Sequence, residues 1–215
     1  NNRVPTMTMP RRMREYTFRQ DQCQRRYEPH VEAINRYIDQ LGDTVPYVPP
    51  LHGGCKARLL NVLSDPGPMA QHSRFVCIEN DDPTAETLWH LFHNARIPAH
   101  DAILWNAYPW YINKNPTAAQ LSIGIVPLKR IIDLLPQLKV VMLHGGTAHR
   151  AWKEFVNANP TLVKERELCV IKTYHPSRQA FIHKDPKVRE MRRQHIVDAF
   201  TQCRQELGPT QTNRA

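Results

Sequence analysis

Three polar residues, Asp65, Asn106 and His175, each follow a short apolar run of the sequence and carry side chains that can do chemistry. The run ARLLNVL is followed by one serine and then by Asp65. The run AILW directly precedes Asn106, and CVIKTY directly precedes His175. A carboxylate can orient or deprotonate water, and an imidazole can donate a hydrogen bond to a group on which negative charge develops. An amide offers a donor and an acceptor, so it can select a ring with the matching pattern. Brought together by the fold, these side chains could form a hydrolytic site.

The apolar runs read as strands, and segments of helical periodicity alternate with them. Strands are predicted at residues 57–63, 101–109, 139–145 and 167–176, and helices at 27–43, 81–97, 117–138 (interrupted at Pro127), 147–157 and 185–207. This alternation predicts an α/β fold of three layers, α/β/α, around a central four-stranded, mainly parallel sheet. Ligands bind beyond the carboxyl ends of the strands in such sheets. The three polar residues are expected at that edge.

Length and composition restrict the class of protein. The 215 residues fit a single domain, 1–215, with a loose basic arm up to about residue 18. A hydrophobic content of 41% argues against a membrane protein and against a disordered chain. No run is long enough to cross a bilayer, and no signal peptide is visible. The formal net charge of +9 suits a polyanion partner such as nucleic acid, although a solvated basic face has the same composition.

The five cysteines are widely scattered and include no CxxC pair. A disulfide framework is therefore not expected, and neither is a zinc or iron–sulfur site, because such sites usually have closely spaced ligands. We expect reduced thiols, no metal and no cofactor.

Three motifs occur in an order that resembles the uracil-DNA glycosylase superfamily. They are an Asp-Pro turn after the first strand, an asparagine that ends the second strand, and HPS after the last strand. The resemblance spans about residues 57–181 and implies the fold of that family. The stretch LSDPGPMAQ keeps the aspartate and proline of the housekeeping motif Gly-Gln-Asp-Pro-Tyr-His. Its PGPMAQ is closer to the single-strand-selective branch, which has Asn-Pro-Gly-Pro followed by Met-Ala-Gln. The chain thus resembles a divergent member with features of both branches, and the absent cysteine cluster excludes the iron–sulfur branches.

The resemblance implies two catalytic residues. Asp65 would orient or deprotonate the attacking water and support positive charge on the sugar. His175, in its neutral form, would hydrogen-bond a carbonyl of the departing uracil. Each residue alone also has a structural interpretation, since Asp65 before a proline fits an Asx turn and a single histidine is often only structural. The ordered set favours function.

The resemblance also implies a base-binding set of Asn106, Phe75, Gly67, Pro66 and Ser64. The Asn106 amide matches O4 and N3–H of uracil, whereas cytosine reverses that pattern. Asn106 could instead only tie down the turn that follows it. Phe75 is the residue chosen to stack on a flipped base, with Tyr108 and Trp110 as alternatives. Gly67 stands where the housekeeping branch has a tyrosine beside C5 of the base, so a roomier pocket is expected.

The loop HPSRQAF is expected to bind DNA through Pro176, Ser177, Arg178 and Gln179. Ser177 would contact phosphate, and Arg178 or Gln179 would enter the space that the base leaves. A solvated loop with a stray arginine is the alternative. Gly145 and Gly146 are expected to allow a tight strand-to-helix turn, with phosphate contact as a second possibility.

The predicted function is a monofunctional uracil-DNA glycosylase of base excision repair. It would flip uracil out of single- or double-stranded DNA, hydrolyse the N-glycosidic bond and leave an abasic site. We expect a monomer that is intracellular and DNA-associated, in a bacterial cytoplasm or nucleoid or in a nucleus. Alternatives are a glycosylase of the same fold for xanthine, hypoxanthine or an oxidised pyrimidine, and a catalytically silent nucleic-acid-binding protein. An unrelated α/β hydrolase is disfavoured because its GxSxG, Walker and GxGxxG loops are absent.

Overall fold

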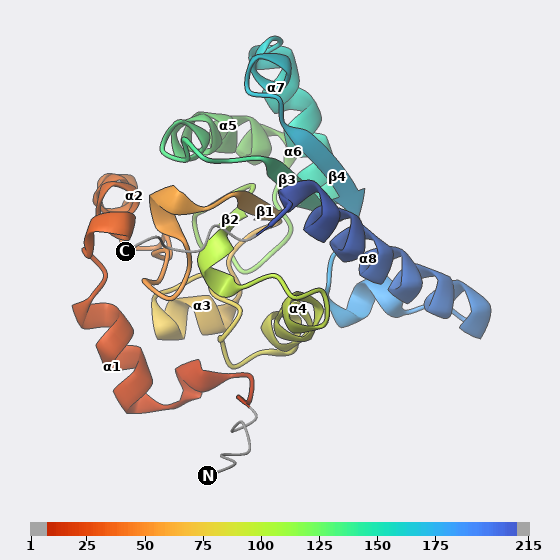
Figure 1. Cartoon of the computed structure of the whole chain (residues 1–215), viewed down its shortest axis with the longest axis horizontal. Coiled ribbons are helices and arrows are strands. Elements are labelled where there is room, and N and C mark those ends of the chain that lie inside the picture. The colour runs from red at the N-terminus through yellow and green to blue at the C-terminus, as the bar shows by residue number, and fades with distance from the viewer. Residues whose placement is uncertain (1–7, 210–215) are drawn as a thin grey trace.

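The computed structural model describes residues 8–209, and its centre is a sheet of four strands that are all parallel. The strands are β1 (Leu59–Leu63), β2 (Ala102–Asn106), β3 (Val140–His144) and β4 (Cys169–Thr173), in the order β2-β1-β3-β4. Leu63 pairs with Asn106, and His144 pairs with Thr173. Because the strands are parallel and in register, their carboxyl ends meet at one edge of the sheet (Figure 1).

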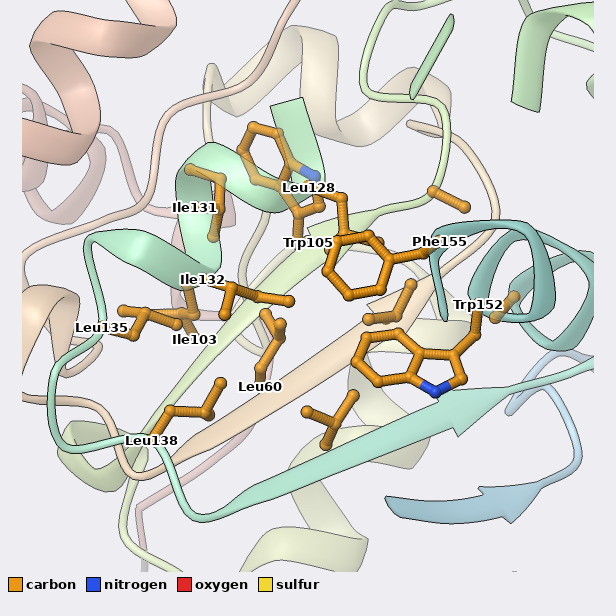
Figure 2. Packing of buried hydrophobic residues seen from close by; sticks show 14 of the residues in the cluster. Leu60, Ile103, Trp105, Leu128, Ile131, Ile132, Leu135, Leu138, Trp152 and Phe155 are labelled. Atoms are coloured by element: carbon orange, nitrogen blue, oxygen red, sulfur yellow. The ribbon is translucent and has the colours of Figure 1, made fainter. Parts of the chain in front are cut away.

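Helices cover both faces of this sheet, and alternating strand residues serve the two cores. One face carries α2 (Pro29–Leu41), α5 (Ala118–Asp133) and α6 (Gly146–Ala158). There Leu60 of β1, Leu128 of α5 and Trp152 of α6 belong to one buried cluster (Figure 2). The other face carries α4 (Pro83–Asn94) and α8 (Pro186–Leu207), packed on Leu59, Leu104 and Met142. The predicted three-layer α/β/α fold is confirmed, with a sheet that is wholly parallel.

The helix ends follow their local sequence in most places. Asp82 caps α4 by accepting a hydrogen bond from the Ala85 N–H, and Pro83 occupies the first helical position, as its fixed φ allows. The predicted interruption at Pro127 is wrong, because α5 runs through it. A proline inside a helix costs about 3 kcal/mol, and the burial of neighbours such as Leu121 and Leu128 offsets that cost. The remaining short elements are α3 (Pro68–Ser73), α7 (Leu162–Glu165), η1 (Arg12–Arg14), η2 (Gly54–Lys56), η3 (Ala99–Asp101) and η4 (Arg178–Phe181).

The N-terminal segment departs from its prediction as a loose arm. Residues 1–7 lie outside the described range, but residues 11–18 form η1 and the start of α1 (Tyr16–Gln24). Met13 is 1% exposed and packs in a small cluster with Phe75 and Cys77. The sequence predicted that the arginines of this segment are solvated, whereas in the structure they form ion pairs with carboxylates of residues 79–86. That residues 1–215 form a single domain stays a prediction.

No helix within residues 8–209 is long and apolar enough to span a membrane.

Candidate active site

A cavity of about 330 Å³ lies at the carboxyl edge of the sheet, and Asp65, Asn106 and His175 all line it. Ligand pockets commonly measure about 300–1,000 Å³, so the cavity has the size of a small-molecule site. Its other walls come from β1, from β2, from the turn after β1, from α3, from the first half of α4 and from the segment between these two helices. They are Leu63, Pro66, Gly67, Pro68, Met69, Ala70, Val76, Cys77, Asn80, Asp82, Pro83, Thr84, Ala85, Leu88 and Leu104. The fold thus brings together three residues that are far apart in the sequence.

Asp65 stands on the turn between β1 and α3. The Ala107 and Tyr108 N–H groups donate to the carbonyls of Leu63 and Ser64, at 3.1 and 3.0 Å, and so extend the strand pairing into this turn. The Ser64 hydroxyl donates to Oδ1 of Asp65 at 2.7 Å. Burial raises the pKa of the Asp65 carboxyl, and the Ser64 hydrogen bond works against that shift. A carboxylate with a raised pKa is the stronger proton acceptor, which suits a general base.

Asn106 is the last residue of β2 and is only 4% exposed. Among residues 8–209 no hydrogen bond joins its side-chain amide to another protein group, and the amide atoms are not sealed from the cavity that Asn106 lines. The amide can therefore both donate to and accept from a ligand in the cavity.

A glycine on α5 holds the residue after Asn106. A Cβ at Gly124 would collide with the carbonyl oxygen of Ala107, so only glycine lets the helix approach this closely. The helix therefore fixes the end of β2, and with it the place of Asn106.

His175 lies in the loop after β4, and its protonation can be assigned from its contacts. The Ser177 N–H donates to Nδ1 at 3.2 Å, so Nδ1 is an acceptor and a neutral ring carries its proton on Nε2. Burial lowers the pKa of His175 to about 4, which keeps the ring neutral at neutral pH. His175 can therefore present an N–H donor in the cavity.

The turn after β3 allows the His175 loop to pack where it does. Gly145 has a φ of 89°, and a Cβ there would lie 2.9 Å from Cβ of His175. Both the left-handed backbone and the close approach require glycine. The predicted tight turn at Gly145 is confirmed.

The residues predicted beside Asp65 are divided between two hollows. Pro66 lines the cavity, Gly67 lines both the cavity and the groove beside it, and beyond the chain next to Gly67 no atom of residues 8–209 lies within 4 Å of where its Cβ would be. Ser64 instead lines a neighbouring groove, where it also supports Asp65. The open space at Gly67 agrees with the expected absence of a side-chain wall.

Phe75 does not reach the cavity, and the prediction that it stacks on a base needs correction. Its side chain is fully buried against Met13 and Cys77, and its ring centroid lies 6.2 Å from that of Tyr47. The cause is local: α3 ends at Arg74, whose left-handed φ of 71° redirects the chain before Phe75.

The alternatives to Phe75 do not line the cavity either. Tyr108 and Trp110 pack on each other at 5.1 Å, on the α5 side of the sheet. Within residues 8–209 no Phe, Tyr or Trp side chain is part of the cavity wall. Aliphatic and thioether groups provide its apolar surface instead, namely Met69, Val76, Leu88 and Leu104.

A groove of about 730 Å³ adjoins the cavity and is lined by the loop predicted to bind DNA. Ser177, Arg178 and Gln179 all line it, and the last two are exposed. It shares Asp65, Gly67, Pro68 and His175 with the cavity, so the two hollows meet at these residues. Gly145, Gly146 and Thr147 form another part of the groove. Pro176 is buried, which corrects its prediction as a DNA contact: it can shape the loop but offers little surface.

Sequence reasoning missed a polar part of the cavity that comes from the segment ENDDPT. Asn80, Asp82 and Thr84 line the cavity. Asn80 accepts from the Ser73 hydroxyl at 2.7 Å and donates to the Phe75 carbonyl at 2.8 Å, so its amide is already paired. The run of polar residues was a usable signal, but the sequence was used there only to predict a helix over residues 81–97.

His144, at the end of β3, is a second missed residue. It is fully buried, lines the groove and has Nε2 at 2.9 Å from Oδ1 of Asn61. Burial lowers its pKa to about 3, so it too is neutral at neutral pH.

In the part of the chain that is described, no group of three or more His, Cys, Asp or Glu side chains is placed to hold a metal ion.

The fold is that of an α/β protein with a parallel sheet. At the carboxyl edge of this sheet lies a polar cavity of the size of a small-molecule site, next to an open groove. The chain belongs to the uracil-DNA glycosylase superfamily, because the family model described as Uracil DNA glycosylase superfamily matches residues 52–201. The matched region includes Asp65, Asn106, His175 and the loop to Gln179. Membership supports a DNA glycosylase of base excision repair, which hydrolyses an N-glycosidic bond and takes DNA as its substrate. A search of curated proteins gave no match to this chain.

Proposed function

We propose that the protein is a monofunctional uracil-DNA glycosylase that flips uracil into the cavity and hydrolyses its bond to deoxyribose. The observation that carries this proposal is one cavity lined by a half-buried carboxylate, an unpaired amide and a neutral imidazole, from Asp65, Asn106 and His175. Each group matches one demand of the reaction.

Asn106 reads the base. Its amide offers an acceptor to N3–H and a donor to O4 of uracil, and both ends are free for a ligand. Cytosine has a donor at position 4 and an acceptor at N3, so the same amide orientation leaves buried groups unpaired. Unpaired buried groups are the strongest source of discrimination between similar ligands.

His175 and Asp65 act on the bond. As the C1′–N1 bond breaks, its electron pair moves to uracil, and the Nε2–H of His175 donates to a base carbonyl that gains negative charge. Asp65 supports the positive charge on the sugar and takes a proton from the water that adds to C1′. The products are an abasic site and the uracil anion, which becomes free uracil by taking up a proton from solvent while Asp65 releases the proton that it accepted.

DNA would lie in the groove beside the cavity. We assign Ser177 to phosphate contact and Arg178, with Gln179 as the alternative, to the space left by the flipped base. The protein acts as a monomer on DNA inside the cell in this proposal. Only the side chains of the site are needed for these steps, so activity is expected to persist in excess chelator.

A second candidate is a glycosylase of the same fold that removes a larger or otherwise modified base. It is favoured by the open space at Gly67 and by the absence of Phe, Tyr and Trp from the cavity wall within residues 8–209. Both leave room that uracil alone does not fill.

The two candidates are separated by one assay. Oligonucleotides that contain uracil, 5-substituted uracils, xanthine, hypoxanthine or no damaged base are incubated with the protein in excess chelator, and alkali then cleaves abasic sites. Cleavage at uracil supports the proposal, and cleavage only at another base supports the second candidate. No cleavage anywhere would leave a silent nucleic-acid-binding protein, and activity that returns only with zinc or magnesium would contradict the metal-free chemistry.

A further inference from the structure

One wall of the cavity is a segment that has two sides. Residues 76–85, which we name the outer wall, connect α3 to α4. Cys77, Asn80 and Asp82 line the cavity. The residues between them, Glu79 and Asp81, bind the N-terminal segment instead. Contacts on the N-terminal side therefore act directly on residues that shape the cavity.

The N-terminal side is formed by residues 11–14, which we name the clasp. Arg12 donates to Oε2 of Glu79 from both its backbone N–H and its Nε, each at 3.1 Å. The Met13 N–H donates to the Glu79 carbonyl at 2.9 Å. From the α4 side, Trp89 Nε1 donates to Oε1 of Glu79 at 2.6 Å. The Glu79 side chain is only 1% exposed, so the clasp supplies the partners that a buried carboxylate requires.

Two further contacts join the clasp to the outer wall and to the start of α4. Arg11 pairs with Glu86 at 2.7 Å, and Arg14 pairs with Asp81 at 2.9 Å. These pairs are partly exposed and are expected to add little individually.

The contact that matters most for the cavity is apolar. Met13 is 1% exposed and lies in one small buried cluster with Cys77, which itself lines the cavity, so one side chain separates the clasp from the cavity.

We propose that the clasp is a positioning element of the base pocket: it holds the outer wall in place and so limits the size of the base that the cavity accepts. The clasp lies outside residues 52–201, where the family model matches. The first part of this proposal rests on packing alone, and the second part rests on the proposed function.

Cysteine labelling tests the first part without any need for activity. Burial raises the pKa of the Cys77 thiol, and a thiol reacts only as the thiolate and only when reached by solvent, so its alkylation reports opening of the outer wall. Cys203 is also buried, on α8 in the core that α4 and α8 form with the sheet. Its alkylation rate therefore reports general loosening of the fold. Mass spectrometry measures the two rates in wild type and in Arg12→Gln and Met13→Ala.

In both variants Cys77 is expected to react about tenfold faster or more, because loss of a hydrogen bond to a charged group, or of a packed side chain, shifts an opening equilibrium by at least that factor. Cys203 should keep its wild-type rate. Arg12→Lys keeps the charge and should partly restore the slow labelling of Cys77. The matched control is Arg25→Gln, since within residues 8–209 the Arg25 side chain pairs only with Asp21 and Glu28 of its own segment. An unchanged Cys77 rate, or an equal rise at Cys77 and Cys203, would overturn the proposal.

Base selectivity tests the second part. Single-turnover rates for uracil and for a bulky 5-substituted uracil are compared in wild type, Arg12→Gln and Arg25→Gln. The rate for the bulky substrate divided by the rate for uracil should rise severalfold in Arg12→Gln and stay unchanged in Arg25→Gln. If Cys77 is alkylated faster in Arg12→Gln while this ratio of excision rates is unchanged, the claim that the clasp limits base size is overturned. If wild type excised neither substrate, the proposed function would fail, while the labelling rates would still decide whether the clasp holds the wall.

Discussion

At the scale of single residues, the site depends on side chains that the fold leaves unsatisfied or holds in one protonation state. Asn106 lines the cavity with an amide that no protein group within residues 8–209 hydrogen-bonds, and His175 is kept neutral with its ring proton on Nε2. Asp65 is half-buried with a raised pKa. These states are ready for a ligand before it binds, which is what electrostatic catalysis requires.

Replacement of Asp65 tests its assignment as the base. Asp65→Asn should lower the single-turnover rate of uracil excision about 10²–10⁴-fold, the usual contribution of a general base. The amide is close in size to the carboxyl, so the variant should unfold at a similar temperature. A rate near that of wild type would show that another group holds the water.

The open space at Gly67 should govern tolerance of larger bases. We expect wild type to excise some 5-substituted uracils as well as uracil. Gly67→Tyr should fold normally, because a side chain there meets no atom of residues 8–209 within 4 Å of its Cβ. It should slow excision of the bulky bases much more than that of uracil. Equal effects on both in competition assays would mean that position 67 is not a wall of the base site.

At the scale of elements, the sequence predicted the scaffold well, for a physical reason. The strands β1, β2 and β3 are short runs buried along their whole length, and the edge strand β4 is partly buried. Helices with one apolar face alternate with the strands, so periodicity alone separates them. Parallel strands then place Asp65, Asn106 and His175 at one edge, without knowledge of any contact.

Features that depend on packing between distant segments were not predictable in this way. Phe75 follows the Asp-Pro turn at a plausible spacing, but the left-handed residue Arg74 turns it into a different cluster. Arg11, Arg12 and Arg14 looked solvated because their carboxylate partners are 67 to 75 residues away in the sequence. Pairing at such separations leaves no periodic trace in the sequence.

The loop after β4 is expected to matter most in paired DNA. An extruded base costs a few kcal/mol of unstacking and unpairing, least in a single strand. The exposed Arg178 can fill the gap by stacking its planar guanidinium and can pair with phosphate. Arg178→Ala should therefore impair excision from duplex more than from single strands, and should reduce the salt slope of duplex binding by about 0.9. Gln179→Ala is the companion variant: a larger effect there would move the role by one residue, and equal losses on both substrates would make Arg178 a general phosphate contact.

At the scale of the whole molecule, three buried neutral histidines link stability to pH. Burial lowers the pKa of His52 and His175 to about 4 and that of His144 to about 3. Between these values and the unfolded value near 6.5 the unfolded chain binds more protons than the folded one, so the free energy of unfolding rises with pH in that window. Asp65, whose folded pKa is raised, acts in the opposite direction at the acid end.

Urea unfolding between pH 7 and pH 4 should show this loss. Each such histidine contributes a slope of about 1.4 kcal/mol per pH unit within its window. His144→Gln should reduce the slope, whatever it does to the stability at pH 7. A free energy of unfolding that stays constant from pH 6.5 to pH 4 would show that these rings are not held neutral by burial.

The most direct measurement is the release of free base in a single turnover, from strands that carry one uracil or one cytosine, by wild type and by Asn106→Asp. Wild type should release uracil and no cytosine. The variant should release uracil about 10- to 100-fold more slowly, because a carboxyl group cannot donate and accept as the amide does, and each lost hydrogen bond in a buried site has about that effect. Chromatography of the products identifies the base. Failure of wild type to release uracil, or an Asn106→Asp variant with unchanged rate and unchanged discrimination against cytosine, would contradict a uracil site built on Asp65, Asn106 and His175.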